Sequence, residues 1–399
     1  MVMYSVVEKL RCSVSQCLLA VALAFYGSLL FAQDDILVGM SGDMSGLSAD
    51  IGLEMKRGLE LGFAEINASG GVQGRKVRLL ARDDGYVPLM AARNVRQLID
   101  EEHVNAILGS IGTPMAMLTV PIINKRGVLM FGAFTGASVL RQDNVGCCVY
   151  NYRASYKQEI GMMLEHILNS GIKPNEIALL TQKDASGDTT YDVAIEKLKE
   201  YGLENAGPLL HTRYRKNTHN VEQSVADVLT ATVPPKAIIM ISTYGASSLF
   251  INLLKAELPN LKYYHISYTG SKPLAELLEK DTDGIYITSV VPHVNADNAL
   301  TRQYRESYVK QRGATDFSST SLEGYIVAKI FIEVLQSIPG EINKTSILRA
   351  IERIGPLHTS TGPVPLRLKQ TSRQASQAIW LHQFVDGQFK QIAVNYDSQ

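Results

Sequence analysis

The amino-acid sequence predicts an α/β protein with two lobes, each a doubly wound parallel β-sheet covered by helices. From Asp35 onward, short β-branched apolar runs alternate with longer segments of helical period. Strands regularly separated by single helices form βαβ units, which imply parallel strands and right-handed crossovers. The same rhythm starts again after Tyr150. Because strongly twisted open sheets rarely exceed about ten strands, two sheets are expected rather than one.

The composition is that of an ordinary globular protein. The 399 residues are 46% hydrophobic, and 39 Lys and Arg balance 39 Asp and Glu. This hydrophobicity excludes a disordered chain, and 4 cysteines are too few for a disulfide scaffold. A neutral chain without a long basic run offers no electrostatic surface for nucleic acid or an anionic membrane, which leaves small ligands and protein partners. At about 100 to 200 residues per domain, the length suits two domains.

Residues 1–32 are expected to be a cleaved secretory signal peptide. Lys9 and Arg11 precede a 16-residue apolar stretch from Cys17 to Ala32, and polar residues follow at once. This pattern is typical of a signal with cleavage after Ala32. The stretch is shorter than the roughly 20 residues of a spanning helix, so an uncleaved anchor is the lesser alternative.

Export determines how the cysteines are interpreted. Cys12 and Cys17 leave with the signal, so the exported chain keeps only the adjacent pair Cys147 and Cys148. Neighbouring Cα atoms lie about 3.8 Å apart, closer than in most disulfides, so a vicinal disulfide would be strained. The alternative is two partly buried thiols near a strand start. The histidines show no paired spacing, and no metal site is predicted.

The first half of the chain alternates strands and helices. In residues 50–67, Ile51, Met55 and Leu59 recur at the spacing of one helix face. The predicted strands are Ile36–Met40, Val77–Ala81, Ala106–Leu108 and Val128–Phe131, and the predicted helices are 50–67, 88–101 and 114–125.

The second half repeats this pattern and ends in a hairpin. The predicted strands are Ile177–Leu180, 208–213, Ala237–Ile241, Tyr263–Ile266 and Gly284–Val290, and the predicted helices are 156–170, 189–201, 219–230, 246–256, 273–279, 298–312 and 321–337. Thr320 and Glu323 have the spacing of a capping box at the start of the last helix. Asp386 and Gly387, between two apolar runs, predict a β-hairpin.

Five turns at the carboxyl ends of predicted strands are rich in Gly, Ser and Thr. They are residues 42–48, 109–114, 132–138, 242–245 and 268–271. In open α/β sheets, ligands bind at this edge. Thr113 before Pro114 is typical of an N-cap and first helical residue, and free N–H groups there would hold an anionic group such as a carboxylate. Such residues also make ordinary turns, but five aligned turns favour a binding cleft.

Catalysis has little support in the sequence. There is no Gly-x-Ser-x-Gly after a strand, no phosphate-binding Gly-x4-Gly-Lys-Ser/Thr and no His-Glu-x-x-His. Tyr325 and Lys329 lie one helical turn apart, as in short-chain dehydrogenases, but residues 39–46 have the wrong spacing for a dinucleotide-binding turn. No enzymatic activity and no cofactor are therefore expected, with a nicotinamide-dependent dehydrogenase using Tyr325 and Lys329 as a minor alternative.

Seven short motifs occur together in a characteristic order and spacing. They are Ile66–Gly74, Asp83–Gly85, Gly109–Pro114, Phe131–Gly136, Tyr150–Tyr156, Tyr214–Thr218 and Ser321–Tyr325. From Asp35 to about Val394, the chain resembles the leucine/isoleucine/valine-binding protein family, the extracytoplasmic substrate-binding proteins of ABC importers. The resemblance implies the type I periplasmic binding protein fold, in which two lobes joined by three crossings close on a ligand.

The resemblance also implies where the lobes begin and end. Lobe 1 would be 33–151 plus 291–365, lobe 2 would be 152–290 plus 366–399, and the crossings would be Val149–Arg153, Thr288–His293 and Gly362–Leu366.

Matched residue by residue, the resemblance implies a ligand site in the cleft. Its residues would be Ser110, Gly112, Thr113, Ala133, Thr135 and Gly136 from lobe 1, and Tyr156, Ser186, Tyr244 and Thr269 from lobe 2. Amino-acid-binding members often place an acidic residue in the turn matched by Tyr268–Gly270, to pair with the ligand ammonium, and this chain has none there. A buried cation without a partner is costly, so an amino acid would need another carboxylate or hydroxyl and carbonyl acceptors.

The function that the resemblance implies is solute capture. The protein would be a periplasmic monomer that binds a small polar solute, a branched-chain amino acid or a related carboxylate or amide, and hands it to an ABC permease in the inner membrane. A ligand sensor of the same fold, acting on a membrane receptor, is the alternative.

Other residues have more than one interpretation. Asp83 and Asp84 are expected to cap or solvate the next turn rather than bind a metal. Arg153 would either clamp a ligand carboxylate or form a structural ion pair. Three strand tyrosines, at 263, 264 and 286, are expected in the core or at its rim.

Overall fold

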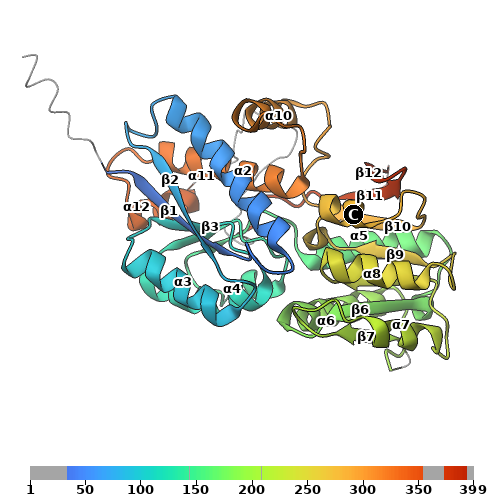
Figure 1. Ribbon diagram of the computed structural model, residues 1–399. Helices are drawn as coiled ribbons and strands as arrows, with labels where there is room; N and C mark the ends of the chain where they lie inside the picture. The colour runs from blue at the N-terminus through green and yellow to red at the C-terminus, as the bar shows by residue number, and fades with distance from the viewer. Residues whose placement is uncertain (1–33, 143, 208, 354–372, 393–399) are drawn as a thin grey trace, which may run out of the picture.

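A computed structural model describes residues 34–142, 144–207, 209–353 and 373–392. Figure 1 shows two lobes side by side, each with a sheet between helices. The predicted signal peptide, residues 1–32, and the predicted crossing Gly362–Leu366 lie outside the described residues. Within the described part of the chain, no helix is both long and apolar enough to cross a membrane.

The first sheet has five parallel strands in the order β2-β1-β3-β4-β5. The strands are β1 (Ile36–Gly42), β2 (Val77–Asp83), β3 (Ala106–Leu108), β4 (Leu129–Phe131) and β5 (Val149–Tyr150). The chain leaves β1 for β2 on one side and returns to β3 on the other. This is the predicted doubly wound order, and in sheets of this kind ligands bind at the carboxyl ends of the strands where the order reverses.

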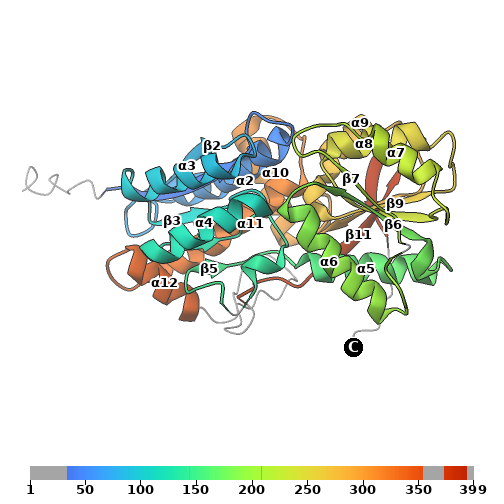
Figure 2. The same cartoon turned by 90° about the horizontal axis from the view of Figure 1, so that it is seen from below.

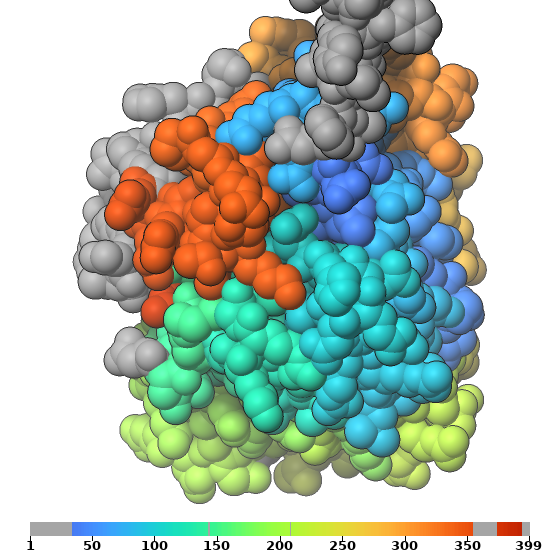
Figure 3. Space-filling model, turned by 90° about the vertical axis from the view of Figure 1, so that its left-hand side faces the viewer, coloured from blue at the N-terminus to red at the C-terminus, as the bar shows by residue number. Residues whose placement is uncertain are grey.

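Two helical layers enclose this sheet. The helices are α2 (Ala49–Ala68), α3 (Pro88–Asp100), α4 (Thr113–Arg126), α10 (Ala299–Arg312), α11 (Ser319–Gln336) and α12 (Lys344–Arg353). Successive strand residues face opposite layers, so Leu108 packs with α2 and α11 whereas Ile107 packs with α3 and α4. Figure 3 shows α12 in orange beside the blue-green helices at the outer end of the lobe. The sequence did not predict α12, since it buries only Ile347 and Ile351.

The second sheet has seven strands in the order β12-β11-β10-β9-β8-β6-β7. The strands are β6 (Ile177–Gln182), β7 (His211–Tyr214), β8 (Ala237–Ile241), β9 (Lys262–His265), β10 (Ile285–Ser289), β11 (Trp380–Val385) and β12 (Gln388–Gln391). The first five are parallel, and β11 and β12 form the predicted hairpin antiparallel to β10.

Helices cover both faces of the second sheet. They are α5 (Tyr156–Asn169), α6 (Ala185–Glu200), α7 (Glu222–Leu229), α8 (Tyr244–Leu254) and α9 (Ser271–Leu277). Figure 2 shows α5 and α6 on one face and α7, α8 and α9 on the other. The tyrosines at 263, 264 and 286 are all buried in this lobe, as predicted, and the rings of the last two stack 4.7 Å apart.

Three segments run between the lobes. One follows β5, and residues 290–298 lead from β10 to α10. The described part of the third, residues 373–379, lies along the first. Asn151 N donates to Arg373 O at 2.7 Å, and Ala375 N donates to Asn151 O at 2.8 Å. Two of the segments therefore form one hydrogen-bonded joint.

Two predicted helix caps are wrong. The N-cap of α4 is Gly112, with φ +92°, and Thr113 is the first helical residue. The N-cap of α11 is Ser318, whose hydroxyl accepts from Ser321 N at 3.0 Å, so Thr320 is already inside the helix. In each helix the N-cap is the last residue whose backbone is still non-helical. The spacing of side chains in the sequence does not reveal which residue that is.

Helices α2 and α11 pack unusually closely because glycines face each other across the contact. A Cβ atom on Gly58 would lie 2.0 Å from Ser321 O, and one on Gly324 would lie 2.5 Å from Met55 O. Neither side can accept a methyl group without moving a backbone. This contact sets the position of the N-terminal end of α11, which reaches the joint between the lobes.

We predict that Gly58→Ala destabilises the protein by about 1 to 3 kcal/mol, because overpacking forces the helices apart. The matched control is Gly161→Ala in α5, where the nearest atom would lie 4.0 Å away. That change should stabilise by about 0.5 to 1 kcal/mol, since alanine loses less backbone entropy in a helix. Urea unfolding of both variants measures the difference, and equal midpoints would contradict the close-packing argument.

Candidate functional site

The polar carboxyl ends of the two sheets meet where the lobes touch. The ring of Phe134, after β4, lies 5.8 Å from that of Tyr268, after β9. The hydroxyl of Tyr86, after β2, donates to Asp184 Oδ2, after β6, at 3.5 Å. These contacts bring together the edges at which open α/β sheets bind ligands.

Two turns of lobe 1 are joined into one surface. Phe134 N donates to Ser110 O at 2.8 Å, and Gly112 N donates to Phe134 O at 3.3 Å. Three predicted site residues, Ser110, Gly112 and Ala133, are thereby brought together. The methyl group of Ala133 packs into the core with α3 and α4, so only its backbone is left for a ligand. The Ser110 hydroxyl is buried without a hydrogen-bond partner.

A row of hydroxyl groups runs from lobe 1 to lobe 2. The hydroxyl oxygens of Thr113 and Thr135 lie 2.7 Å apart, and Thr135 Oγ1 donates to Tyr156 Oη at 3.3 Å. Tyr156 N donates to Gly136 O at 2.8 Å. The structure therefore places four predicted site residues in one connected group.

The remaining predicted residues of lobe 2 lie in the first turn of a helix or, for Thr269, two residues before α9 begins. Helix α6 begins four residues earlier than predicted because Asp184 caps it by accepting from Gly187 N at 3.0 Å, so Ser186 lies in its first turn. Tyr244 is the first residue of α8 rather than part of a preceding turn. Burial and the neighbouring Asp50 of lobe 1 raise the pKa of Tyr244. Thr269 Oγ1 donates to Ser242 O at 3.0 Å, so its hydrogen is used within lobe 2.

Sequence reasoning missed Tyr86 as a residue of the interface between the lobes. It is only 3% exposed and has φ +57°, a conformation that non-glycine residues seldom adopt and that costs energy. Lys216 Nζ of lobe 2 lies 5.5 Å from its ring centroid. In the sequence, Tyr86 follows Asp83-Asp84-Gly85 after a predicted strand, and this position was the feature that could have indicated it. No periodicity of the neighbouring residues marks Tyr86.

The adjacent carboxylates before Tyr86 cap their turn, as predicted. Asp83 accepts from Met44 N at 2.8 Å and from Gly85 N at 3.0 Å. Asp84 accepts from Tyr86 N at 3.0 Å, and burial raises its pKa to about 6. Among the described residues, no group of three or more His, Cys, Asp or Glu could hold a metal ion.

Arg153 forms the structural ion pair that was one of its two predicted roles. Its Nε and Nη2 each donate to a Glu323 carboxylate oxygen at 3.0 Å. The two side chains are only 1% and 2% exposed. The guanidinium lies 4.1 Å from the Phe134 ring centroid, which adds a cation–π contact. This pair ties the first crossing to α11.

Several buried polar atoms without a hydrogen-bond partner lie at or near the interface between the lobes. Such atoms are rare in folded proteins, and each calls for an explanation. In the described part of the chain they include Ser110 Oγ, Arg153 Nη1, Glu159 Oε1 and Ser267 Oγ. A polar molecule held between the lobes would provide the missing partners.

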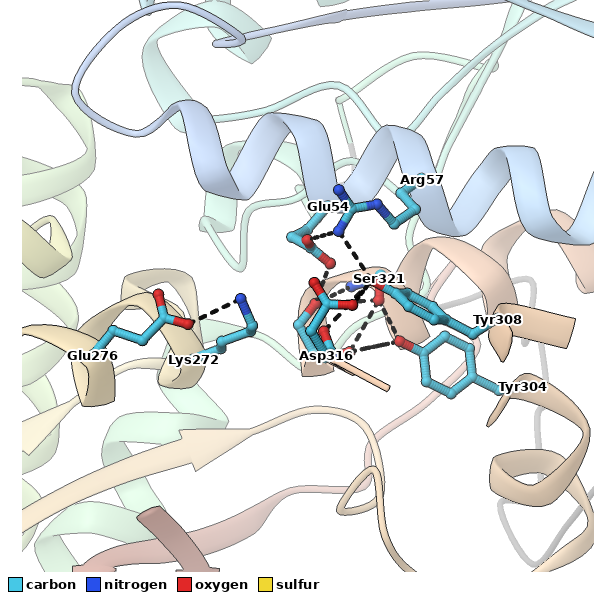
Figure 4. Close-up of polar contacts among 9 residues, drawn as sticks. Glu54, Arg57, Lys272, Glu276, Tyr304, Tyr308, Asp316 and Ser321 are labelled. Carbon is cyan, nitrogen blue, oxygen red and sulfur yellow. Dashed lines mark hydrogen bonds and ion pairs between the residues drawn. The ribbon is translucent and has the colours of Figure 1, made fainter. Parts of the chain in front are cut away.

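A network of charged and hydroxyl side chains lies at one side of the interface (Figure 4). Ser318 Oγ donates to Glu54 Oε2 at 2.6 Å, and Lys272 of α9 pairs with Glu276 at 3.0 Å. Partial burial lowers the pKa of Lys272, but Glu276, Glu54 and Asp316 outweigh it and raise that pKa. Because Glu54 and Asp316 belong to lobe 1, these charges attract the two lobes toward each other.

Tyr325 and Lys329 do not lie at this interface. Tyr325 Oη donates to Glu65 Oε1 at 2.9 Å, and Lys329 Nζ pairs with Glu65 at 3.1 Å. Both residues therefore belong to the contact between α11 and α2. Cys147 and Cys148 are both free thiols, as in the second interpretation of the pair, but Cys147 is exposed rather than partly buried, and Cys148 is buried.

A separate hollow of about 400 Å³ lies at the outer end of lobe 1. Residues 337–341 and one side of α12 line it. It contains none of the predicted site residues and is not part of the interface between the lobes.

Comparison with known proteins gives concordant matches. Residues 35–388 match the family model described as periplasmic binding protein. Leu/Ile/Val-binding protein homolog 7 of Brucella abortus (strain 2308) is 28% identical in an alignment of 331 residues that covers 77% of this chain and 79% of that protein.

Solved structures match over nearly their whole length. A possible leucine/isoleucine/valine-binding protein from Rhodopirellula baltica SH 1 superposes with a TM-score of 0.86 and 36% identity, covering 91% of this chain and 97% of its own. A branched-chain amino acid ABC transporter protein from Thermus thermophilus with bound valine gives a TM-score of 0.82. It covers 92% of this chain and 98% of its own, and its 16% identity supports likeness of fold alone.

We predict that Glu323→Gln destabilises the protein by about 3 to 5 kcal/mol, because it leaves the Arg153 charge buried without its partner. Glu196→Gln is the matched control, since Glu196 pairs with Lys157 at 2.6 Å on the exposed surface. That change should cost less than about 1 kcal/mol. Denaturant unfolding of both variants compares the costs, and a small loss for Glu323→Gln would show that the pair contributes little.

Proposed function

The chain belongs to the periplasmic binding protein family, and from this premise we propose that it captures a small polar solute between its lobes for an ABC importer. The solute is a branched-chain amino acid or a related carboxylate or amide. In this proposal the protein acts as a monomer in the periplasm and hands the solute to a permease in the inner membrane.

The observation that carries the proposal is the set of unpartnered buried polar atoms at the interface between the lobes. Ser110 belongs to lobe 1, and Ser267 belongs to lobe 2. Leaving such an atom unpaired costs about 1 to 3 kcal/mol, which favours a polar molecule held by both lobes. A ligand that contacts both lobes only in the closed state shifts the protein toward that state by its difference in affinity.

The start of α4 suits a carboxylate group of the solute. Thr113 and Met115 stand in the first turn, where backbone N–H groups have no intrahelical acceptor. The helix dipole favours negative charge at this end. The hydroxyl oxygens of Thr113 and Thr135 lie 2.7 Å apart, and rotating either hydroxyl about its C–O bond would turn its hydrogen from its protein partner toward the solute.

The positions of Tyr325 and Lys329 do not support the dehydrogenase alternative. Glu65 engages both side chains between α2 and α11. We therefore propose a binding protein without catalytic activity.

A cognate solute should raise the melting temperature of the protein. At about 100 times its dissociation constant, it should stabilise the folded state by about 2.7 kcal/mol. A thermal-shift panel of branched-chain amino acids, small carboxylates and amides measures this effect. If no compound of these classes shifts the transition at millimolar concentration, solute capture in this form is wrong.

Thr113→Ala and Thr135→Ala should each weaken solute binding by about 5- to 30-fold, because each removes a hydroxyl partner worth about 1 to 2 kcal/mol. Thr230→Ala is the control, since its hydroxyl donates to Ala226 O at the exposed end of α7, away from the other lobe. Isothermal titration calorimetry with the compound found in the panel gives the affinities. Undiminished affinity in both variants would place the carboxylate site elsewhere.

A further inference from the structure

A small cavity lies on the hinge side of the interface between the lobes. Its volume is about 10 Å³, enough for one water-sized group. Phe134, Arg153, Ser267, Thr288, Ser319 and Glu323 are among the residues that line it. Phe134 also belongs to the turn that carries Thr135 and Gly136, so the cavity adjoins the proposed solute site.

Three polar atoms at this cavity or next to it have no partner. Arg153 uses Nε and Nη2 on Glu323, which leaves Nη1 buried and free. Ser267 Oγ is also buried and free. Glu159 holds Ser267 N at 2.7 Å and Thr288 Oγ1 at 2.5 Å through Oε2, while its Oε1 has no partner. One free donor, one free acceptor and one free hydroxyl therefore occur together.

The charges around the cavity already cancel. Arg141 Nη2 donates to Arg153 O at 2.8 Å, so two arginines stand beside Glu159 and Glu323. All four side chains are in or next to the joint, and their formal charges sum to zero. Because these four charges already compensate one another, an added anion or cation would remain an uncompensated charge in a buried region. Burying an unpaired charge is far more costly than burying a hydrogen-bonded neutral group.

We propose that this cavity is the subsite for an uncharged end of the solute, a primary carboxamide. Its carbonyl oxygen fits the volume and accepts from Arg153 Nη1. Its NH₂ group donates to the unpartnered acceptors, Ser267 Oγ and Glu159 Oε1. The inference rests on the proposed function and specifies it, because the other end of the solute is the carboxylate held by the start of α4.

The first test compares end groups on carbon chains of equal length. The probes are the monoamides succinamate, glutaramate and adipamate, the matching dicarboxylates, and the matching monocarboxylates butanoate, pentanoate and hexanoate. Calorimetry should show at least one monoamide binding about 10-fold or more tightly than the dicarboxylate and the monocarboxylate of its length. A tenfold factor is the loss expected when one buried polar contact is missing.

The second test uses Ser267→Ala with Thr282→Ala as its matched control. Thr282 Oγ1 is also buried and unpartnered, but it lies after α9, away from the cavity. Ser267→Ala should lower the affinity for the preferred monoamide about 5-fold or more and leave monocarboxylate affinity unchanged. Neither variant should lose stability, since each deletes a hydroxyl that makes no hydrogen bond. Thr282→Ala should leave every affinity unchanged.

The outcomes separate this inference from the proposed function. Equal affinity for a monoamide and its monocarboxylate, tighter binding of a dicarboxylate, or an unchanged monoamide affinity in Ser267→Ala would overturn the subsite and leave solute capture standing. If none of these probes and none of the amino acids of the thermal-shift panel binds, the proposed function fails and the subsite fails with it.

Discussion

The buried ion pair between Arg153 and Glu323 is the interaction on which the two-lobed arrangement depends. Arg153 lies in the segment that leaves lobe 1, and Glu323 lies near the start of α11. Helix α11 is held against α2 by the contact at Gly58 and Gly324, so the carboxylate has a fixed position in lobe 1. A buried charge tolerates little displacement from its partner. If the two groups separated, both charges would stay buried without a partner and without water. The pair therefore fixes this point of the joint relative to α11.

The partly exposed charges and the buried polar groups at the interface contribute differently to holding the two lobes together. The charges of Figure 4 are partly exposed, and such pairs are worth at most about 1 kcal/mol each. They guide the lobes together without deciding whether the closed state is stable. The buried hydroxyl and guanidinium groups near the joint are shielded from water and have polar atoms without partners. In the proposed function, a bound molecule that supplied those partners would provide the main difference in free energy between open and closed states.

The turn Tyr268–Gly270 has no acidic residue, and two carboxylates near it are already hydrogen-bonded within the protein. Asp43 accepts from Gly46 N at 2.6 Å and Ser48 N at 3.0 Å. Asp184 accepts from Gly187 N at 3.0 Å and from the Gln182 amide at 2.6 Å. Both carboxylates serve as caps in their own lobes. In the proposed function, neither carboxylate would be free to pair with a ligand ammonium near this turn, and Glu159 Oε1 is the unpartnered acceptor beside it.

The sequence by itself determined the two α/β lobes, the order of most helices and strands, the terminal hairpin and the turns rich in Gly, Ser and Thr. Alternating periods and turn residues are local properties that neighbouring positions such as Ile51, Met55 and Leu59 already express. Only the tertiary structure decided that Arg153 meets Glu323, that Tyr86 bridges the lobes, and that Ser267 borders a cavity. Arg153 and Glu323 are separated by 170 residues. Their pairing follows from the packing of α11 on α2, where two glycines allow close approach, and no local pattern encodes that distance.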